Sequence, residues 1–314
     1  MNNLELEKMA NEIRKDIVTA VHSAKSGHPG GSLSSADIFT YLYFEEMNVD
    51  PANPKWEDRD RFVLSKGHVA PGLYSTLAEK GYFPKEDLKT LRHTGSYLQG
   101  HPDMKHIPGI DMSSGSLGQG VSVAVGMAAA GKYDKKDYRV YTLTGDGEIQ
   151  EGQIWEAAMW AGHRKLDNLV VIVDNNNLQI DGSVEDVCSP YPIDKKFEAF
   201  NFHVINVADG NDMEQLAGYL TKDEHTAEPR KDGTQGKPRI AESSYNTSRN
   251  MPLPEPKTDK LVRWKPEVKP PKGYYIARIH EGINPVTGFL YRSYTLIRLK
   301  TQERKKPPNR VRRC

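Results

Sequence analysis

Two strand-like segments, each ending in a polar turn and separated by one helix-like segment, constrain the fold more than any other feature of this sequence. Residues 138–143 (YRVYTL) predict a strand, because β-branched and aromatic residues dominate them, and they lead into TGDGEIQEG at 144–152. Helical periodicity follows over about residues 152–165, and a second apolar segment at 169–173 (LVVIV) leads into DNNNLQIDG. This order predicts two neighbouring parallel strands joined by a helix.

The same alternation continues through the first 220 residues. Apolar residues at helical spacing predict a helix over residues 4–25, and a Gly/Ser loop, SGHPGGSLSS, follows it. Further helices are predicted at ADIFTYLYFEEM, GLYSTLAEKG and VSVAVGMAAAGKY and after Asp212, and short buried strands at RFVLSKGH and HVINV. We therefore predict an α/β fold: a doubly wound, mostly parallel sheet with helices on both faces.

The chain changes character near Thr221. Residues 221–314 contain 22 Lys and Arg against 10 Asp and Glu, and 11 of the 20 prolines, whereas the first 220 residues carry 21 basic against 32 acidic side chains. We predict an α/β domain over residues 1–220 and a basic, proline-rich tail over residues 221–314. Low apolar content predicts disorder for much of this tail in isolation, with one small hairpin from YYIARI and FLYRSYTLIRL.

The remaining composition narrows the class of protein. No apolar run approaches the ~20 residues needed to span a membrane, and the charged N-terminus is unlike a signal peptide. Two cysteines, Cys188 and Cys314, make neither a disulfide framework nor a zinc site, and this favours a reducing cytoplasm. We expect a cytoplasmic protein that does not interact with a membrane.

Acidic and amide side chains follow the two central strands. Asp146 and Asn176 lie 30 residues apart, each just after a predicted strand. Because the ends of neighbouring parallel strands lie close together, these oxygens and a backbone carbonyl suit Mg²⁺ beside a phosphate-bearing ligand. Glycines 145 and 147 permit close backbone approach. A glycine-flanked aspartate alone is more often a turn or a helix cap, and Glu148 is expected to be structural.

Six motifs appear together in a fixed order. They are SGHPGG (26–31), SKGH (65–68), QGHPD (99–103), SSGSLGQG (113–120), GDGEIQEG (145–152) and DNNNLQIDG (174–182). The set resembles the N-terminal segment of transketolases, and most closely the separate N-terminal, thiamine diphosphate-binding subunit of split bacterial transketolases. The resemblance covers about residues 5–220.

The resemblance implies a cofactor site at the strand ends. It assigns Mg²⁺ (or Ca²⁺) to the side chains of Asp146 and Asn176 and the carbonyl of Leu178, and the metal would hold the diphosphate of thiamine diphosphate. Glu151 matches a glutamate at the family's subunit contact. The other implied cofactor-binding residues are Gly115, Ser116, Leu117, Gly145, Gly147, Asn176 and Ile180.

The resemblance also implies the chemistry. His28, His68 and His101 match catalytic histidines around the sugar substrate, suited to proton transfer and to hydroxyl recognition. The implied reaction is transfer of a two-carbon ketol unit between sugar phosphates, as in the pentose phosphate pathway. The family's pyrimidine domain has no counterpart in this chain, so a partner subunit carrying it is implied, in an α₂β₂ assembly.

Residues 221–314 depart from the family pattern. After VINVADGND the family continues into a strand, a KGKG-like loop and a Trp-His-Gly segment whose histidine contacts the cofactor. This chain has neither KGKG nor Trp-His-Gly, and GKPRIA at 236–241 alone resembles the start of that strand. A divergent extension, a fusion and an altered reading frame are all open as the tail's origin.

Three other readings stay open at this point. Two are thiamine diphosphate enzymes of another kind, a deoxyxylulose-phosphate synthase or a component of a 2-oxoacid dehydrogenase, the second disfavoured by the three histidine motifs. The third is a non-catalytic protein whose basic tail binds nucleic acid through phosphates and stacking tyrosines.

Overall fold

The computed structural model describes residues 1–180, 182–220, 239–244, 274–283 and 290–298. The chain divides into two compact units, Met1–Met251 and Pro252–Cys314. In the second unit, β8 (Tyr274–Ile283) and β9 (Leu290–Arg298) pair antiparallel, which confirms the predicted hairpin. Most of the predicted tail lies outside the described residues, so the division at residue 220 and the nucleic-acid reading of the tail stay predictions.

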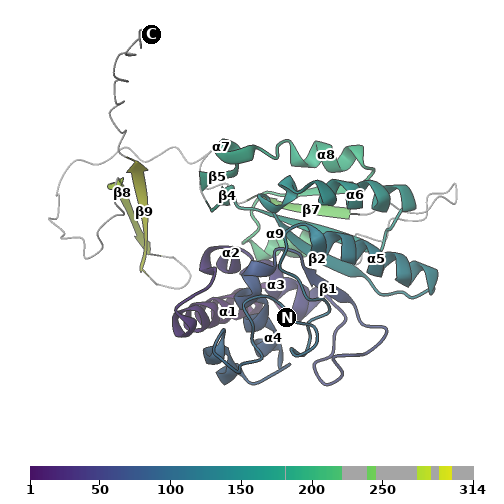
Figure 1. Cartoon of the computed structure of the whole chain (residues 1–314), viewed down its shortest axis with the longest axis horizontal. Helices are drawn as coiled ribbons and strands as arrows, with labels where there is room; N and C mark the ends of the chain where they lie inside the picture. The colour runs from purple at the N-terminus through teal and green to yellow at the C-terminus, as the bar shows by residue number, and fades with distance from the viewer. Residues whose placement is uncertain (181, 221–238, 245–273, 284–289, 299–314) are drawn as a thin grey trace, which may run out of the picture. The chain divides into compact units, whose positions relative to one another are not determined.

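A five-stranded sheet organises the first unit (Figure 1). Its order is β1-β2-β3-β7-β6, and every neighbouring pair is parallel. Its strands are β1 (Arg61–Leu64), β2 (Val140–Gly145), β3 (Leu169–Asn175), β7 (Arg239–Ser244) and β6 (His203–Val207). A separate two-stranded ribbon joins β4 (Leu178–Gln179) to β5 (Gly182–Ser183). The predicted mostly parallel sheet is confirmed.

The helices begin and end close to where the sequence places them. Asn2 and Glu5 form a reciprocal capping box at the start of α1, and Gly81, in the left-handed region at φ 96°, ends α4. The helical segments are α1 (Asn3–Ala24), α2 (Pro29–Ser34), α3 (Ala36–Tyr41) with η1 (Leu42–Glu46), η2 (Gly67–Val69), α4 (Ala70–Lys80), η3 (Lys85–Thr90), α5 (Gln119–Tyr133), η4 (Glu148–Gln150), α6 (Gly152–Arg164), α7 (Val184–Cys188), α8 (Ile193–Ala199) and α9 (Met213–Leu220).

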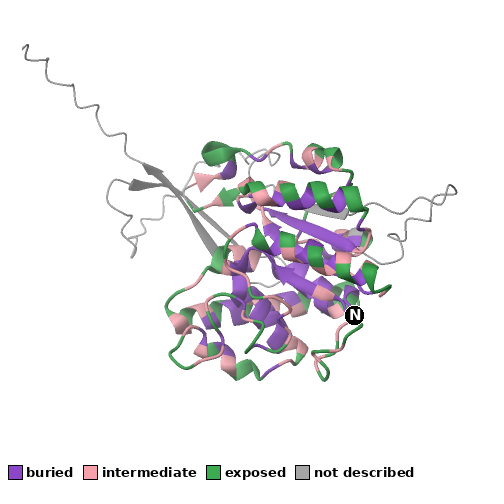
Figure 2. Cartoon of the chain, turned by 45° about the vertical axis from the view of Figure 1, so that its right-hand side comes forward, coloured by how far each residue is buried: buried purple, intermediate pink, exposed green. Residues whose placement is uncertain are grey.

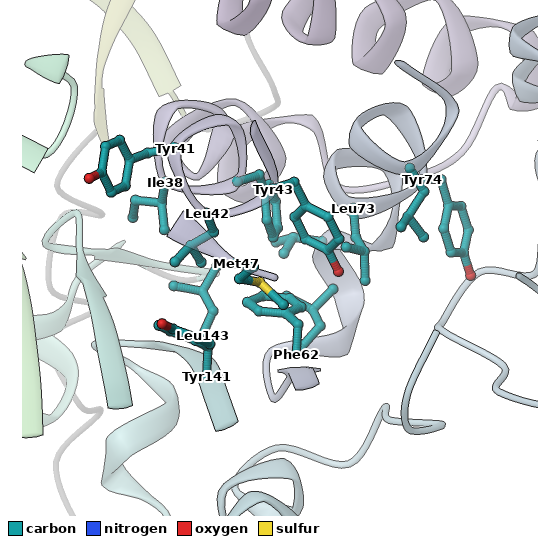
Figure 3. Close-up of a cluster of buried hydrophobic side chains, with 14 of the residues drawn as sticks. Ile38, Tyr41, Leu42, Tyr43, Met47, Phe62, Leu73, Tyr74, Tyr141 and Leu143 are labelled. Carbon is teal, nitrogen blue, oxygen red and sulfur yellow. The ribbon is translucent and has the colours of Figure 1, made fainter. Parts of the chain in front are cut away.

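Alternate residues of the central strands belong to two separate apolar cores. Figure 2 shows the central strands as buried. Tyr141, Leu143 and Ile172 pack in the core that α1, α3, α4 and α9 cover, and Tyr43 meets Phe62 there edge to face at 5.7 Å (Figure 3). Val140 and Val171 pack on the other face beneath α5, α6 and α8. The sheet is therefore covered on both faces, as a doubly wound fold requires.

The structure adds α7, α8 and the β4–β5 ribbon, which the sequence analysis does not predict, and it differs from the expectation at two further segments. The expected Gly/Ser loop contains helix α2, whose first residue is Pro29, because proline's fixed φ suits the first helical position. Strand β7 lies beyond residue 220 and pairs with both β3 and β6, so the segment resembling a family strand is a strand of the main sheet. Little apolar sequence marks β7, which is why periodicity gave it only weak support.

Candidate functional site

The carboxyl ends of β1, β2 and β3 lie at one edge of the sheet. Leu64 pairs with Leu143, and Gly145 pairs with Asp174, so these strands end side by side. The SKGH segment, the GDG turn and the NNN turn follow these three strand ends directly. Ligands of open α/β sheets bind at this edge, and the candidate site is built there.

Asp146 joins the GDG turn to the NNN turn. Its carboxylate accepts a hydrogen bond from the Gly147 amide at 2.8 Å and another from the Asn177 amide at 2.5 Å. The residue is 2% exposed, and burial raises the pKa of its carboxyl to about 6, against the lowering effect of those two amides. The predicted proximity of the two strand tips is therefore observed.

Asp174, two residues before Asn176, is committed to other partners. It accepts hydrogen bonds from the hydroxyls of Ser34 (2.8 Å) and Ser35 (3.2 Å), and it forms an ion pair with Lys66. Lys66 and Asp174 are each 2% exposed. A buried charge of this kind is stable only when it is paired and hydrogen-bonded, so Asp174 serves to anchor the end of β3.

Glu148 is committed in the same way. It is 3% exposed and accepts hydrogen bonds from Ser65, Gly118 and Gly145. A carboxylate offers about four lone-pair sites. Of the three buried acids at this edge, Asp146 accepts from two backbone amides and forms no ion pair within the described part of the chain, and so it best retains capacity for a metal ion.

The NNN turn presents the other predicted oxygens. The Asn176 side-chain oxygen accepts a hydrogen bond from the Leu178 amide at 3.0 Å. The Tyr191 hydroxyl contacts the side-chain oxygens of Asn175 (2.7 Å) and Asn177, on either side of Asn176. These contacts fix the turn beside Asp146. The side chains of Leu178 and Ile180 are 65% and 97% exposed, and the cofactor role of Ile180 stays a prediction.

Residues 112–120 form a second wall at the same edge. A pocket of about 220 Å³ is lined by residues 112–116 and by the first residues of α5. The Ser114 hydroxyl is buried there without a hydrogen-bond partner among the described residues. A Cβ at Gly67 would lie 2.9 Å from the backbone of Ser114 and of Gly115, so glycine lets the SKGH segment approach this wall.

The three predicted histidines gather beside that wall. The rings of His28 and His68 lie edge to face with their centroids 5.2 Å apart. The side chain of His101 lies 3.5 Å from the position that a Cβ on Gly115 would take. His28 and His101 are exposed, and His68 is half-buried. The sequence-based grouping of these residues is therefore reproduced, from three loops far apart in the chain.

The histidine environment favours neutral rings. Burial, then the nearby charges of Lys66, His28 and His101, lowers the pKa of His68 to about 4. Burial, then Arg92 and His28, lowers the pKa of His101 below its ordinary value. A neutral imidazole carries one donor and one acceptor nitrogen, which suits recognition of sugar hydroxyls and proton transfer.

The residues present fit a diphosphate with a divalent cation. A buried carboxylate, an amide oxygen and a backbone carbonyl are oxygen donors that Mg²⁺ prefers, and the Ser114 hydroxyl offers a further polar contact. The described residues contain no group of three His, Cys, Asp or Glu side chains that could hold a metal ion. The predicted ligand set is of another kind, because it has one carboxylate, one amide oxygen and one backbone carbonyl.

Sequence reasoning missed several residues that shape this site. Lys66, Ser34 and Ser35 anchor Asp174, and Tyr191 anchors the asparagine turn. A lysine two residues after a buried strand was a usable signal for Lys66, because a charge in that position needs a partner. The serines and Tyr191 have no such signal, since their partners are distant in sequence.

Glu151 lies at the N-cap of α6 and is exposed. Its side chain is therefore accessible to another polypeptide, and its predicted place at a subunit contact stays a prediction.

No helix in the part of the chain that the structure describes has the length and apolar character needed to cross a membrane.

Comparison with known proteins identifies related sequences. Residues 6–231 match the family model described as "Transketolase, thiamine diphosphate binding domain". The chain is 48% identical over 213 residues to a 6-deoxy-6-sulfo-D-fructose transketolase subunit from Clostridium sp. (strain MSTE9), covering 68% of this chain and 77% of that one. It is 48% identical over 216 residues to a subunit of apulose-4-phosphate transketolase from Phocaeicola vulgatus, covering 69% and 75%.

Solved structures show the same similarity. Transketolase from Leishmania mexicana superposes with a TM-score of 0.70 at 37% identity, over 76% of this chain and 36% of that chain. Transketolase from Campylobacter jejuni gives 0.70 at 36% identity, over 78% and 38%. This chain thus spans little more than a third of the solved enzymes that it matches, but about three quarters of the two subunits.

Proposed function

The chain belongs to the transketolase family, as a thiamine diphosphate-binding subunit, and from this premise we propose that it works with a separate partner polypeptide to transfer a two-carbon ketol unit from a ketose phosphate to an aldose phosphate. The observation that carries the proposal is the junction at Asp146. Its buried carboxylate accepts hydrogen bonds from backbone amides of the GDG turn and of the NNN turn. The diphosphate of the cofactor and its metal would contact these two turns.

The metal in this proposal is Mg²⁺, or Ca²⁺ in its place. Asp146 and Asn176 would hold it through side-chain oxygens and Leu178 through its carbonyl. The support is chemical, because a carboxylate and neutral oxygens suit a hard cation that also binds phosphate oxygens. Gly145, Gly147 and residues 115–117 would then line the diphosphate and the ring next to it.

Bound thiamine diphosphate supplies the electron sink that allows a carbon–carbon bond beside a carbonyl to break and form. The chain's own residues bind, orient and move protons. His28 and His101 lie exposed at the rim, where they can contact sugar hydroxyls, and His68 lies deeper with its pKa lowered to about 4. His68 is therefore neutral at pH 7, and it can accept a hydrogen bond from a hydroxyl without first losing a proton.

A partner is part of this proposal because the site is one-sided. His28, His101 and Glu151 are exposed in this chain, and the chain spans little more than a third of the solved transketolases. We propose that a second polypeptide carrying the pyrimidine domain covers this edge, and that two copies of each polypeptide form an α₂β₂ assembly. A cytoplasmic location and a role with pentose phosphates belong to the same proposal.

The sugar is to be identified by assay. The relatives are named for a sulfonated ketose and for apulose 4-phosphate, so the donor panel should contain both compounds beside xylulose 5-phosphate, with ribose 5-phosphate as acceptor. Deoxyxylulose-phosphate synthesis from pyruvate and oxidation of a 2-oxoacid are the control reactions, because they distinguish the other thiamine diphosphate enzymes.

The test is reconstitution. The full chain is purified alone and also together with a candidate partner polypeptide, and both are assayed with Mg²⁺ and thiamine diphosphate. We expect ketol transfer from the pair and none from the lone chain. Robust turnover by the lone chain would contradict the split-subunit proposal. Failure of calorimetry to detect thiamine diphosphate binding by the pair would contradict the cofactor site itself.

A further inference from the structure

Glu148 is the point where three loops of the candidate site meet. Its Oε1 accepts a hydrogen bond from the Ser65 hydroxyl at 2.6 Å and a second from the Gly118 amide at 2.8 Å. Its Oε2 accepts one from the Gly145 amide at 3.1 Å. One side chain thus holds the end of β1, the segment before α5 and the end of β2.

These three segments are the ones that carry the proposed cofactor contacts. Ser65 begins the SKGH segment, and Gly145 begins the GDG turn, which contains Asp146. Gly118 closes the segment whose residues 115–117 are proposed to line the cofactor. A shift of any one segment relative to the others would change the spacing between the diphosphate turn and the 115–117 wall.

Gly118 shows why a side chain from another loop is needed. It is the N-cap residue of α5, it lies in the left-handed region at φ 82°, and it has no side chain to cap the helix. The first amides of a helix lack partners within the helix itself. Glu148 accepts the hydrogen bond of the Gly118 amide from outside the helix, and so the start of α5 depends on the residue that follows the GDG turn.

We propose that Glu148 is a positioning residue for thiamine diphosphate binding: it fixes the spacing of the SKGH, 115–118 and GDG segments, and thereby sets the affinity for the cofactor without touching the reacting atoms. The inference rests on the proposed function, since it concerns the same site. Its basis is the three hydrogen bonds and the 3% exposure of Glu148.

Glu46, a second buried glutamate that contacts β2, is a matched control for Glu148. It is also a buried glutamate, 5% exposed, and it accepts a hydrogen bond at 2.7 Å from the hydroxyl of Tyr141 in β2. Its partner Tyr141 is the second residue of β2, at the end of the strand away from the GDG turn. A purely structural role for buried glutamates predicts the same behaviour for both residues, and a positioning role predicts different behaviour.

The principal variant is Glu148→Gln. Its amide oxygen can still accept from Ser65 and Gly118, but its NH₂ group then faces the Gly145 amide, donor against donor. We expect faster hydrogen exchange of the Gly145 amide in the cofactor-free full chain. In the reconstituted enzyme we expect the dissociation constant for thiamine diphosphate, at fixed Mg²⁺, to rise ~10–100-fold, the range found for residues that orient metal ligands. The kcat at saturating cofactor should be unchanged.

Two further variants complete the experiment. Ser65→Ala removes one hydroxyl donor and leaves the carboxylate in place, so it should weaken cofactor binding ~2–10-fold, and it carries the test if Glu148→Gln does not fold. Glu46→Gln should lower the unfolding temperature while leaving both the Gly145 exchange rate and the cofactor dissociation constant at parental values.

The outcomes separate this inference from the proposed function. No thiamine diphosphate binding by the parent enzyme would overturn both. Parental binding with an unchanged dissociation constant in folded Glu148→Gln, or in Ser65→Ala where that variant stands in, would overturn the inference alone. The inference would also be overturned if Glu46→Gln lost as much affinity for thiamine diphosphate as Glu148→Gln does, because general destabilisation would then account for both losses.

Discussion

Two regions of the candidate site differ in burial. We call them the strand-end turns, which contain Asp146, Glu148 and Asp174, and the histidine rim, which contains His28, His68 and His101. The turns bury Asp146, Glu148 and Asp174 to 2%, 3% and 2% exposure, and each carboxylate has at least two donors within the chain. The rim exposes His28 and His101, and its histidines come from segments that lie well before the GDG strand.

This difference shows how the work is divided. The turns are pre-organised by the chain alone, because their polar groups already have partners that fix their geometry. The rim presents polar groups toward solvent, where a substrate or a second polypeptide can contact them. Changes in the turns should therefore act on the cofactor, and changes in the rim should act on the sugar.

Asp146→Ala should have the largest effect. It removes the single carboxylate of the proposed metal site, and the dissociation constant for thiamine diphosphate with Mg²⁺ should rise ~10³-fold or more, since groups that merely orient metal ligands are worth ~10–100-fold. Calorimetry on the reconstituted enzyme measures this change. Asp167→Ala, at the opposite end of β3, is the control and should bind as the parent does; equal affinities for both variants would remove Asp146 from the site.

His101→Ala should come next and should separate the two regions. The kcat/KM for the sugar should fall ~10²-fold or more, as for the loss of a general acid–base group, while cofactor affinity stays near the parental value. Steady-state assays and calorimetry on the same preparation give both numbers. His106→Ala, five residues further along the chain and exposed, is the control. Undiminished sugar turnover by folded His101→Ala would show that His101 has no role in catalysis or in sugar binding.

The pH dependence of stability should report on His68. Its pKa is lowered from 6.5 to about 4, so the unfolded chain binds a proton more readily than the folded chain between these values. The stabilisation is complete above pH 6.5 and is lost as the pH falls toward 4. The parent should lose about 2 kcal/mol more than His68→Asn between pH 7 and pH 4.5.

Urea unfolding at several pH values provides that measurement. His22→Asn, on the exposed surface of α1, is the control and should follow the parent curve. If the free energy of unfolding changed with pH in the same way for the parent and for His68→Asn, the His68 ring would be solvated and would protonate normally. His68 would then resemble the exposed histidines His28 and His101.

Tyr191→Phe should have the smallest effect. It removes a hydroxyl that contacts Asn175 and Asn177 and leaves the ring in place, so Mg²⁺-dependent cofactor affinity should fall by ~0.5–1.5 kcal/mol, the worth of a typical hydrogen bond. Titration of Mg²⁺ at saturating thiamine diphosphate detects this change. Tyr133→Phe, 88% exposed, is the matched control. An identical Mg²⁺ requirement in Tyr191→Phe would show that the asparagine turn holds its shape without help.

Sequence patterns were sufficient for the central strands and helices and for the strand tips, but not for α2, α7, α8 or the β4–β5 ribbon. Alternation of apolar segments placed β2, α6 and β3, and the spacing of Asp146 from Asn176 placed two oxygens at one edge, because parallel strands leave few alternatives. The histidine grouping came from resemblance to a family, since no local pattern links His28 to His101 across the chain.

The supporting contacts could not be predicted in this way. Glu148 was expected to be structural, and that expectation said nothing of Ser65 or Gly118, which reach it only when three loops converge. The pairing of Lys66 with Asp174 likewise depends on the approach of β1 to β3 across β2. Such contacts are consequences of tertiary packing, and residue spacing does not encode them.

The position of β7 has a consequence for how the chain folds during synthesis. β1, β2 and β3 are neighbours in the sheet in the order in which they leave the ribosome, so each can pair as it appears. β6 emerges before its sheet neighbour β7, and residues 208–238 must follow before β7 exists. The sheet is therefore completed by a late strand that enters between β3 and β6, a non-local step that slows folding. A nascent chain halted before Arg239 would hold β6 without its neighbour.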